Sequence, residues 1–486
     1  MKKEKKGYIT LYLTLTMGVM LSLVFVLLEA VRNETIRTET EGVMDIALFS
    51  VFGEYNRQLL EQYDLFFVDT SYGEGRPKVE RMEKHLQYYM NQNFHKKEME
   101  SWLGFRDLTD LSCDNVEFEK YVYASDNQGQ ALKQQIAEYM QDKSGMKKVE
   151  QVLKEFEFVQ NGDIMSMDIG SRWDAAQENL YMLVEEKKRE MASVKEMEEI
   201  PIGLDNPADF VKNVKAQGTL GLVLPAEIPV SSMVIHPEYY VSHREVSKGQ
   251  GSLQIEQSLA DKITEKYFMS EYILEKCGNY LSQKEMAVLQ YQIEYLLKGN
   301  AGDLENLEAV IEDILHIREG INFLYLMSDE GKVMEADMLA TTVSILLFSP
   351  EIKEAVKATI LFAWNYAESV KDIRILLDGN RLPLVKSSNT WNTPLSQLLM
   401  FTSCLEQYQI SREGMSYEDY LRFFLSLESE QQLLYRFMDI CEMDIRVTEG
   451  NQYFQMDGCI FAIEAKANVS SGYGNGYEII RTYTYE

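Results

Sequence analysis

The chain has 486 residues, 45% of them hydrophobic, which is enough to bury a substantial core in about two to three domains. Its 77 acidic residues outnumber 48 basic ones and give a formal net charge of −29. Binding to the phosphates of nucleic acids or of anionic lipids requires a cationic surface. The charge balance therefore argues against a nucleic-acid partner and favours an acidic, solvated surface.

The five cysteines are Cys113, Cys277, Cys404, Cys441 and Cys459. They form no CxxC pair, and an odd number in a chain of this length does not fit a small disulfide-rich domain. We expect most of them to be buried as small hydrophobic side chains. A disulfide between Cys441 and Cys459 stays open as an alternative.

The N-terminal segment contains an uncharged run of 22 residues, from Gly7 to Leu28. As a helix this run would reach roughly 33 Å, more than the hydrocarbon core of about 30 Å. Lipid offers no hydrogen-bond partner to a backbone amide or carbonyl, so a segment that spans the bilayer must be helical. We therefore predict a transmembrane helix over residues 7–30, which makes the lipid bilayer a partner of the chain.

The charges on either side of this span predict its orientation. The tail, residues 1–6, carries four lysines, whereas four glutamates and two arginines follow the span within residues 29–41. The positive-inside rule leaves residues 1–6 in the cytoplasm and sends the bulk of the chain across the membrane. The expected location is the cell membrane, with a single pass and an extracytoplasmic body.

Two kinds of processing are alternatives to an uncleaved anchor. A secretory signal peptide has an apolar region of about 7–15 residues and a small-residue cleavage site, whereas this run is longer and continues into the charged segment LLEAVRNE. A prepilin-type peptidase would cut after Gly7, which follows Lys5 and Lys6, but Tyr12 stands where a glutamate is expected. An intact mass that retains Met1 would exclude cleavage after Gly7.

Beyond the membrane, apolar residues recur every four positions from Val43 to Leu59, which predicts a stalk helix over residues 31–60. Residues 61–200 are predicted to form an extracytoplasmic α+β region. The run YDLFFVD, residues 63–69, predicts a short strand, and the alternation in NVEFEKYVYA predicts a second strand near residues 116–123.

Residues 201–251 hold five of the nine prolines, and we interpret them as a loop-rich connection and a candidate domain boundary. Residues 252–446 are predicted to be helical. Two places there have the spacing of a capping box, Ser282 with Glu285 and Ser416 with Asp419.

The C-terminal region, residues 447–486, changes to a period of two. Phe461, Ile463 and Ala465 occupy alternate positions, and a Gly/Ser/Asn turn leads to a second alternating run. This pattern predicts a β-hairpin, which we expect to join the two earlier strands beside the stalk. The predicted fold is α+β and predominantly helical, with an N-terminal transmembrane and stalk helix, a helical body and a small antiparallel sheet that includes the C-terminal hairpin.

Motifs for catalysis, cofactors and metals are absent from the sequence, which has no zinc motif H-E-x-x-H, nucleophile elbow, Walker loop or kinase signature. The nearest approach to a metal site is Glu312, His316 and Glu319 on one helix face, but Arg318 lies beside them and no fourth ligand is evident. The run GYGNGYE fits a hairpin turn better than a phosphate loop, because no helix follows it. We therefore expect no enzyme activity, no cofactor and no metal.

Glu29 closes the uncharged span and is the residue of greatest functional interest. One interpretation is a charge at the end of a helix that reaches the lipid–water interface. The other is a pairing group that sets the register of packed membrane helices, for instance against the cationic N-terminus of another subunit. A Glu29→Gln variant that assembles normally would argue against the second interpretation.

Two N-terminal runs, KGYITLYLTLTMGVMLSLVFVLLEAVR and DIALFSVFGEYNRQLLEQYDLFFVD, resemble the TadE/TadG-like proteins of Tad (tight-adherence, Flp-type) pilus loci in Gram-positive bacteria. Such proteins share a basic tail, one apolar helix ending in Leu-Leu-Glu, a stalk helix and an LFF strand. Three later runs, IREGINFLYLM, AWNYAESVKDIRILLDG and GMSYEDYLRFFL, resemble the body of an uncharacterised family of unknown function found in such loci. The resemblance supplies no catalytic or binding residues.

The resemblance implies a non-enzymatic structural or assembly component of a Tad-like pilus or secretion system, with other Tad pilus or platform proteins as partners. The alternative is a membrane-tethered ligand-binding or sensory ectodomain, which predicts a pocket with convergent polar groups under the loops of residues 201–251. An extracytoplasmic hydrolase is a third hypothesis, which assays with peptide, ester and glycan substrates would test.

Overall fold

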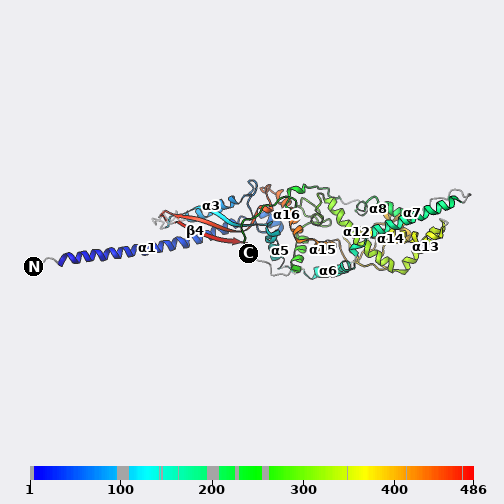
Figure 1. The fold of residues 1–486 in the computed structure, drawn as a ribbon, viewed down its shortest axis with the longest axis horizontal. Coiled ribbons are helices and arrows are strands. Elements are labelled where there is room, and N and C mark those ends of the chain that lie inside the picture. The colour runs from blue at the N-terminus through cyan, green and yellow to red at the C-terminus, as the bar shows by residue number, and fades with distance from the viewer. Residues whose placement is uncertain are drawn as a thin grey trace. The chain divides into compact units, whose positions relative to one another are not determined.

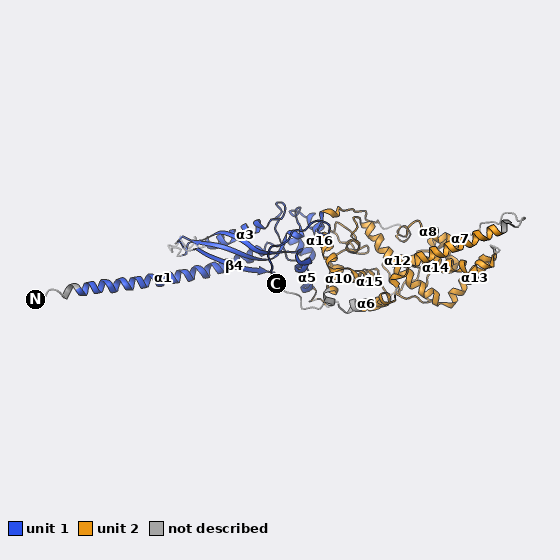
Figure 2. Cartoon of the chain, in the orientation of Figure 1, with its two compact units in different colours: residues 1–139, 239–259, 441–486 blue, residues 140–238, 260–440 orange. Residues whose placement is uncertain are grey.

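Helix α1 (Lys5–Phe52) carries the apolar N-terminal segment and continues well beyond it. The structure is a computed structural model that describes residues 5–95, 109–141, 143, 146–162, 164–193, 207–224, 229–253, 262–346, 349–411, 413–472, 474 and 476–485. Most of the predicted cytoplasmic tail lies outside these residues. The chain divides into two compact units (Figure 2). Unit 1 comprises residues 1–139, 239–259 and 441–486, and unit 2 comprises residues 140–238 and 260–440.

Unit 1 combines α1 with shorter helices and a small antiparallel sheet (Figure 1). After α1, its elements are α2 (Arg57–Tyr63), β1 (Val68–Asp69), α3 (Val79–His95), β2 (Leu111–Tyr123), α5 (Asp126–Gln141), the 3-10 helix η5 (Met456–Gly458), β3 (Cys459–Ser471) and β4 (Gly476–Thr484). Helix α5 and helix α16 (Glu430–Arg446) each contribute residues to both units.

The first half of α1 is apolar and exposed, and it is long and apolar enough to cross a membrane. The hydroxyls of Thr14, Thr16 and Ser22 donate to backbone carbonyls three or four residues earlier. These polar groups are therefore satisfied inside the helix, which lowers the cost of surrounding them with lipid. The chain thus has one N-terminal helix able to anchor it in a membrane.

The second half of α1 is part of the core of unit 1. Met44, Ala47 and Leu48 are at most 1% exposed. The helix ends at Phe52 rather than near residue 60, because Gly53 follows and Asn56 starts a new helix by accepting a hydrogen bond from the amide of Leu59.

The sheet of unit 1 is antiparallel and has β3 at its centre. Strand β2 follows one edge of β3, with Val116 opposite Ala467. Strand β4 follows the other edge as the second arm of a hairpin, and β1 pairs with β3 beyond it. The predicted hairpin and its union with the two earlier strands are confirmed. The first strand is shorter than predicted, since Tyr63 belongs to α2 and pairing is limited to Val68 and Asp69.

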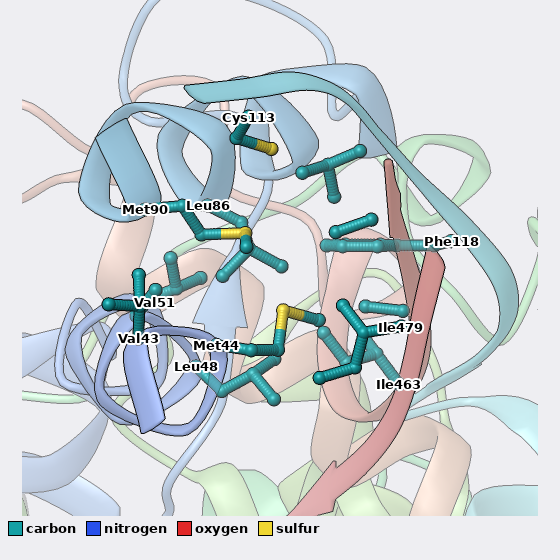
Figure 3. Close-up of a cluster of buried hydrophobic side chains, with 14 of the residues drawn as sticks. Val43, Met44, Leu48, Val51, Leu86, Met90, Cys113, Phe118, Ile463 and Ile479 are labelled. Carbon is teal, nitrogen blue, oxygen red and sulfur yellow. The ribbon is translucent and has the colours of Figure 1, made fainter. Parts of the chain in front are cut away.

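One hydrophobic cluster joins α1, α3 and the inner face of the sheet (Figure 3). Side chains from all three converge there, and they include Val43, Met44, Leu48, Val51, Leu86, Met90, Cys113, Phe118, Ile463 and Ile479. Alternate residues of the strands face this cluster, as the period of two predicts. Burial of these side chains fixes α1 to the sheet.

Residues 239–259 belong to unit 1 although they are far from its other segments in sequence. Arg244 holds them there. Its guanidinium forms a two-point contact with Glu442, at 2.6 and 2.7 Å, and pairs with Asp457 at 2.5 Å. Gln250 forms an antiparallel bridge with Tyr121 of β2. An arginine can make both carboxylate contacts because its donors are arranged in a planar fork.

Unit 2 is helical. Its elements are α6 (Met146–Asn161), η1 (Ile164–Ser166), α7 (Ile169–Ser193), α8 (Pro207–Lys215), α9 (Leu220–Val223), η2 (Pro237–Tyr239, at its border), α10 (Lys262–Lys276), α11 (Gln292–Lys298), α12 (Asp303–Ser328), α13 (Glu330–Leu346), η3 (Pro350–Ile352), α14 (Lys353–Leu377), η4 (Leu395–Cys404), α15 (Tyr417–Leu427) and the start of α16.

Helix α14 is the central element of unit 2 and packs against α7, α8, α12 and α13. Every residue from Ala363 to Leu377 is buried. A helix buried on all sides must provide partners for each polar side chain that it carries. This requirement explains the ion network described below.

One predicted capping box is present and the other is wrong. At the start of α15, Ser416 accepts a hydrogen bond from the amide of Asp419, whose carboxylate accepts one from the amide of Ser416. Residues 282–291, by contrast, are not helical, and α11 begins only at Gln292. The amide of Ser282 donates instead to Asn279, which holds the backbone in a tight turn.

The described part of residues 201–251 contains short helices and irregular chain, and residues 201–206 and 225–228 lie outside the described residues. The chain passes from unit 2 to unit 1 within this region, after residue 238. It returns to unit 2 after residue 259 and to unit 1 again after residue 440. The two units are therefore not consecutive stretches of sequence.

Candidate functional site

The two site residues predicted from the sequence, Gly7 and Glu29, both lie on α1. Glu29 Oε2 is 3.1 Å from Nη1 of Arg32, and both side chains are partly exposed. Glu29 thus has a cationic partner one helical turn away in its own chain. This ion pair reduces the cost of a carboxylate at the end of an apolar helix, and pairing with another subunit stays a prediction.

His316 and Glu319, two of the three residues that come nearest to a metal site in the sequence, have partners of other kinds. The Nε2 of His316 hydrogen-bonds to the backbone carbonyl of Met165, and the buried carboxylate of Glu319 lies 3.5 Å from Nζ of Lys215. Burial raises the pKa of Glu319, while Lys215 acts in the opposite direction. Across the residues that the structure describes, no group of three or more His, Cys, Asp or Glu side chains is arranged to hold a metal ion.

Four charged side chains with no exposed surface form an ion network in unit 2. Arg318 of α12 pairs with Asp372 of α14 at 2.7 Å. Lys386, which follows α14, pairs with the same Asp372 and with Glu368, both at 2.6 Å. Two cations therefore balance two carboxylates in a region from which water is excluded.

The electrostatics of this network favour the charged forms of Arg318 and Asp372. Burial opposes the charge of Arg318, but Asp372 raises the pKa of its guanidinium. Burial likewise opposes ionisation of Asp372, yet Arg318 and Lys386 hold the pKa of that carboxyl below its usual range. Groups that stay charged in this way are suited to holding helices together, and the loss of one partner would leave an uncompensated buried charge.

The sequence patterns did not identify this network, although three of its four members lie in the runs quoted above. Arg318 lies in the run IREGINFLYLM, and Glu368 and Asp372 lie in AWNYAESVKDIRILLDG. Tyr420, from GMSYEDYLRFFL, has its hydroxyl 3.4 Å from Arg318. The available signal was charged residues within apolar helical stripes, but spacing alone could not pair them with Lys386.

A pocket of about 860 Å³ lies beside the segment that Arg318 contacts, and it is lined by residues of α6, of the segment 381–390, and by Ser411, residues 413–415 and Asp419. Helices α6 and α15 lie side by side there (Figure 1). The pocket has an apolar floor of buried side chains, Val152, Leu384 and Met415. Its volume falls within the range of about 300–1,000 Å³ that is typical of ligand sites.

The floor of the pocket is attached to the ion network. Nη1 of Arg318 donates to the backbone carbonyl of Leu384 at 2.7 Å and is 3.3 Å from that of Pro383. The loop on the opposite side is fixed by backbone hydrogen bonds in both directions between Leu382 and Met415. The pocket is therefore built on rigid supports, as a preformed binding site requires.

The ligand-binding alternative predicts a pocket under the loops of residues 201–251, part of which lies outside the described residues. The described residues that line the present pocket come from α6 and from the segments that follow α14. Charged side chains reach it from separate segments, with Glu155 on α6, Arg381 after α14 and Glu413 in the loop before α15. These three residues lie far apart in sequence, and no motif links them.

The cysteines are buried, as expected. No disulfide joins Cys441 and Cys459. Burial raises the pKa of the Cys113 thiol to about 12 and that of Cys459 well above its ordinary value. The thiolate is the nucleophilic form of cysteine, and burial therefore favours the less nucleophilic thiol form of these two side chains.

Comparison with known proteins assigns a family. The model of a family of unknown function, DUF5702, matches residues 195–471, more than half of the chain. The match contains the three runs IREGINFLYLM, AWNYAESVKDIRILLDG and GMSYEDYLRFFL, and it begins after α1. No curated protein and no solved structure matches the chain.

Proposed function

The chain belongs to the DUF5702 family of unknown function, and we propose that it is a non-enzymatic, membrane-anchored component in the structure or assembly of a Tad-like pilus or secretion system. The observation that carries the proposal is the continuity of α1. Its exposed apolar half and the half packed in the core of unit 1 form one helix without a break. A helix of this kind holds the folded unit at a fixed orientation to the segment in the membrane.

The resemblance of the N-terminal runs to TadE/TadG-like proteins supports the Tad assignment. These proteins have the same order of basic tail, apolar helix, stalk and LFF strand. The acidic surface of the body suits a solvated domain that meets protein partners outside the membrane.

The proposed topology places the N-terminus in the cytoplasm and both units outside, because the lysines precede the span. Protease added to intact protoplasts tests this topology. We expect a C-terminal epitope tag to be digested while an N-terminal tag survives until the membrane is permeabilised. A C-terminal tag protected in intact protoplasts would overturn the topology.

The assembly role is tested by purification of the full-length chain from detergent extracts of its host. We expect Tad platform or pilin subunits to co-purify. Glu29→Gln tests whether the carboxylate pairs between subunits, and Glu34→Gln, an exposed glutamate of the same helix, is the matched control. Recovery of no Tad platform or pilin subunit with the wild-type chain would contradict the proposal.

A second function, ligand binding by a membrane-tethered ectodomain, is favoured by the pocket of unit 2. A membrane anchor is compatible with either function, so variants of the pocket are needed to test ligand binding. If variants of the pocket lose a ligand but leave co-purification with pilus proteins intact, the two roles are separate properties of one chain.

A further inference from the structure

The charged groups of the unit 2 pocket differ in how far they are already neutralised. Asp419 is 2% exposed, and its carboxylate is taken up by Arg422, at 2.7 Å, and by Arg381, at 3.2 Å. Glu155 and Glu413 are exposed at the rim. With the residues that the structure describes, neither of these two carboxylates forms an ion pair or a hydrogen bond. The rim therefore offers two carboxylates to a cationic group.

Arg381 offers the complementary charge. Its contacts with the described residues both use Nη1, which donates to the carbonyl of Gly414 at 2.9 Å and to Asp419 at 3.2 Å. The side chain is 40% exposed and lines the pocket. The edge formed by Nε and Nη2 is left for a ligand, and this edge of a guanidinium matches the two oxygens of a carboxylate.

Below these charges lies an apolar surface, the floor of Val152, Leu384 and Met415. Apolar contact at the floor and opposite charges at the rim select a ligand with both kinds of group. The volume of about 860 Å³ exceeds the needs of a single amino acid and suits a few residues.

We propose that this pocket binds a short zwitterionic peptide, whose terminal carboxylate pairs with Arg381 and whose ammonium group pairs with Glu155 and Glu413. The aliphatic side chains of the peptide rest on the floor. The site is preformed, because Arg318 fixes the floor through the carbonyl of Leu384 and the guanidinium of Arg381 fixes the loop at Gly414.

Calorimetric titration of the full-length protein in detergent micelles tests the proposal with trialanine as the probe. We expect trialanine to bind, and its C-terminal amide and its N-acetyl form each to bind at least about tenfold more weakly. Amidation removes the charged pair with Arg381, and acetylation removes the charged pairs with Glu155 and Glu413. Free alanine should bind more weakly than trialanine, since it reaches only one side of the pocket.

Variants then assign each end of the peptide. Arg381→Gln should weaken trialanine about as much as C-terminal amidation does, and amidation should have little further effect in this variant, because both changes remove the same pair. The double variant Glu155→Gln with Glu413→Gln should behave in the same way toward N-acetylation, because the ammonium group pairs with both carboxylates. Arg381→Lys keeps the charge but loses the two-pronged edge, so it should restore binding only in part.

Matched controls separate binding from folding. Arg172→Gln and Glu157→Gln change exposed residues of the same types in unit 2, the second on the same helix as Glu155, and both should leave the affinity unchanged. Each pocket variant is compared only if its thermal unfolding midpoint stays within a few degrees of the wild type. Equal binding of trialanine and its amide, an Arg381→Gln variant with full affinity, or no binding of trialanine at millimolar concentration would overturn the proposal.

Discussion

The phenolic hydroxyl of Tyr485 donates a hydrogen bond of 2.6 Å to the backbone carbonyl of Phe52, the last residue of α1. The two rings are also in contact, with centroids 5.1 Å apart. The last carbonyls of a helix have no partner within the helix, so Tyr485 supplies one of the missing donors. Nearby, Arg481 of β4 pairs with Glu41 and Asp45 of α1, both at 3.4 Å. The C-terminal strand is thereby tied to the helix that carries the apolar segment.

Removal of the Tyr485 hydroxyl should weaken this attachment. We expect Tyr485→Phe to lower the free energy of unfolding by about 1 kcal/mol, the usual value of one hydrogen bond. Tyr485→Ala, which also removes the ring, should cost about 3–4 kcal/mol. Urea unfolding of the full-length protein in detergent measures both. Tyr453→Phe, at a half-exposed tyrosine, is the control, and equal effects of the two Phe variants would contradict the capping role.

The buried ion network should tolerate the loss of a pair better than the loss of one partner. Arg318→Met leaves Asp372 with a single cation, and we expect it to cost about 3–5 kcal/mol of unfolding free energy. The double variant Arg318→Met with Asp372→Leu should be less destabilised than Arg318→Met alone, because Lys386 and Glu368 still balance each other. Denaturant unfolding measures the difference. A double variant as unstable as the sum of the two single variants would show that the charges do not act as a unit.

Glu294 should make stability depend on pH. Burial raises its pKa to about 7, although Tyr417 and the amide of Tyr280 donate to its carboxyl group. The pKa of an unfolded glutamate is near 4.5, so the folded state binds this proton more tightly. The stabilisation is complete below about pH 4.5 and is lost as the pH rises through about 7.

The difference between the pKa values of Glu294 in the folded and unfolded states corresponds to about 3 kcal/mol of unfolding free energy. We expect the Glu294→Gln variant to lose this part of the fall in stability between pH 5 and pH 8, as measured by urea unfolding across that range. Glu285→Gln, at an exposed glutamate, should follow the wild type. A Glu294→Gln curve parallel to the wild-type curve would refute the assignment.

Gly379 and Gly414 both have positive φ, but only Gly414 is crowded by its neighbours. Alanine variants of the two can therefore distinguish the cost of backbone strain from the cost of steric crowding. Gly414 has φ of 108°, and a Cβ there would lie 2.2 Å from the carbonyl oxygen of Leu382. Gly379 has φ of 78° and open space around it. Gly379→Ala should therefore cost only the conformational penalty, about 1 kcal/mol. Gly414→Ala should cost clearly more and should also weaken trialanine binding, because the loop beside Arg381 must move; thermal unfolding and calorimetry measure the two effects.

The apolar half of α1 should tolerate no charge at its centre. We expect Leu21→Arg to raise the cost of membrane insertion by about 3 kcal/mol and to move part of the chain into the soluble fraction. Thr38→Arg, at an exposed position after the apolar segment, should leave the distribution unchanged. Alkaline extraction of membranes followed by immunoblotting measures both fractions. A Leu21→Arg variant retained as fully as the wild type would mean that lipid does not surround this residue.

Local patterns in the sequence were sufficient for the anchor helix, the hairpin and the cap of α15. An uncharged run, a period of two and the pair Ser416 and Asp419 all concern residues close together in the chain, so their meaning does not depend on the rest of the fold. The same local evidence failed at Ser282, where the side chain and carbonyl of Asn279 provide better partners for the backbone than a helix would.

What the sequence determined by itself was the fold class and the N-terminal apolar helix, since hydrophobic periodicity and charge are properties of neighbouring residues. The tertiary structure alone decided where α1 ends, how Lys386 meets Glu368 and Asp372, and which segments enclose the pocket of Glu155, Arg381 and Glu413. These features arise when segments distant in sequence are packed together. The energy of a buried charge or an enclosed cavity depends on those distant neighbours, and no local pattern encodes them.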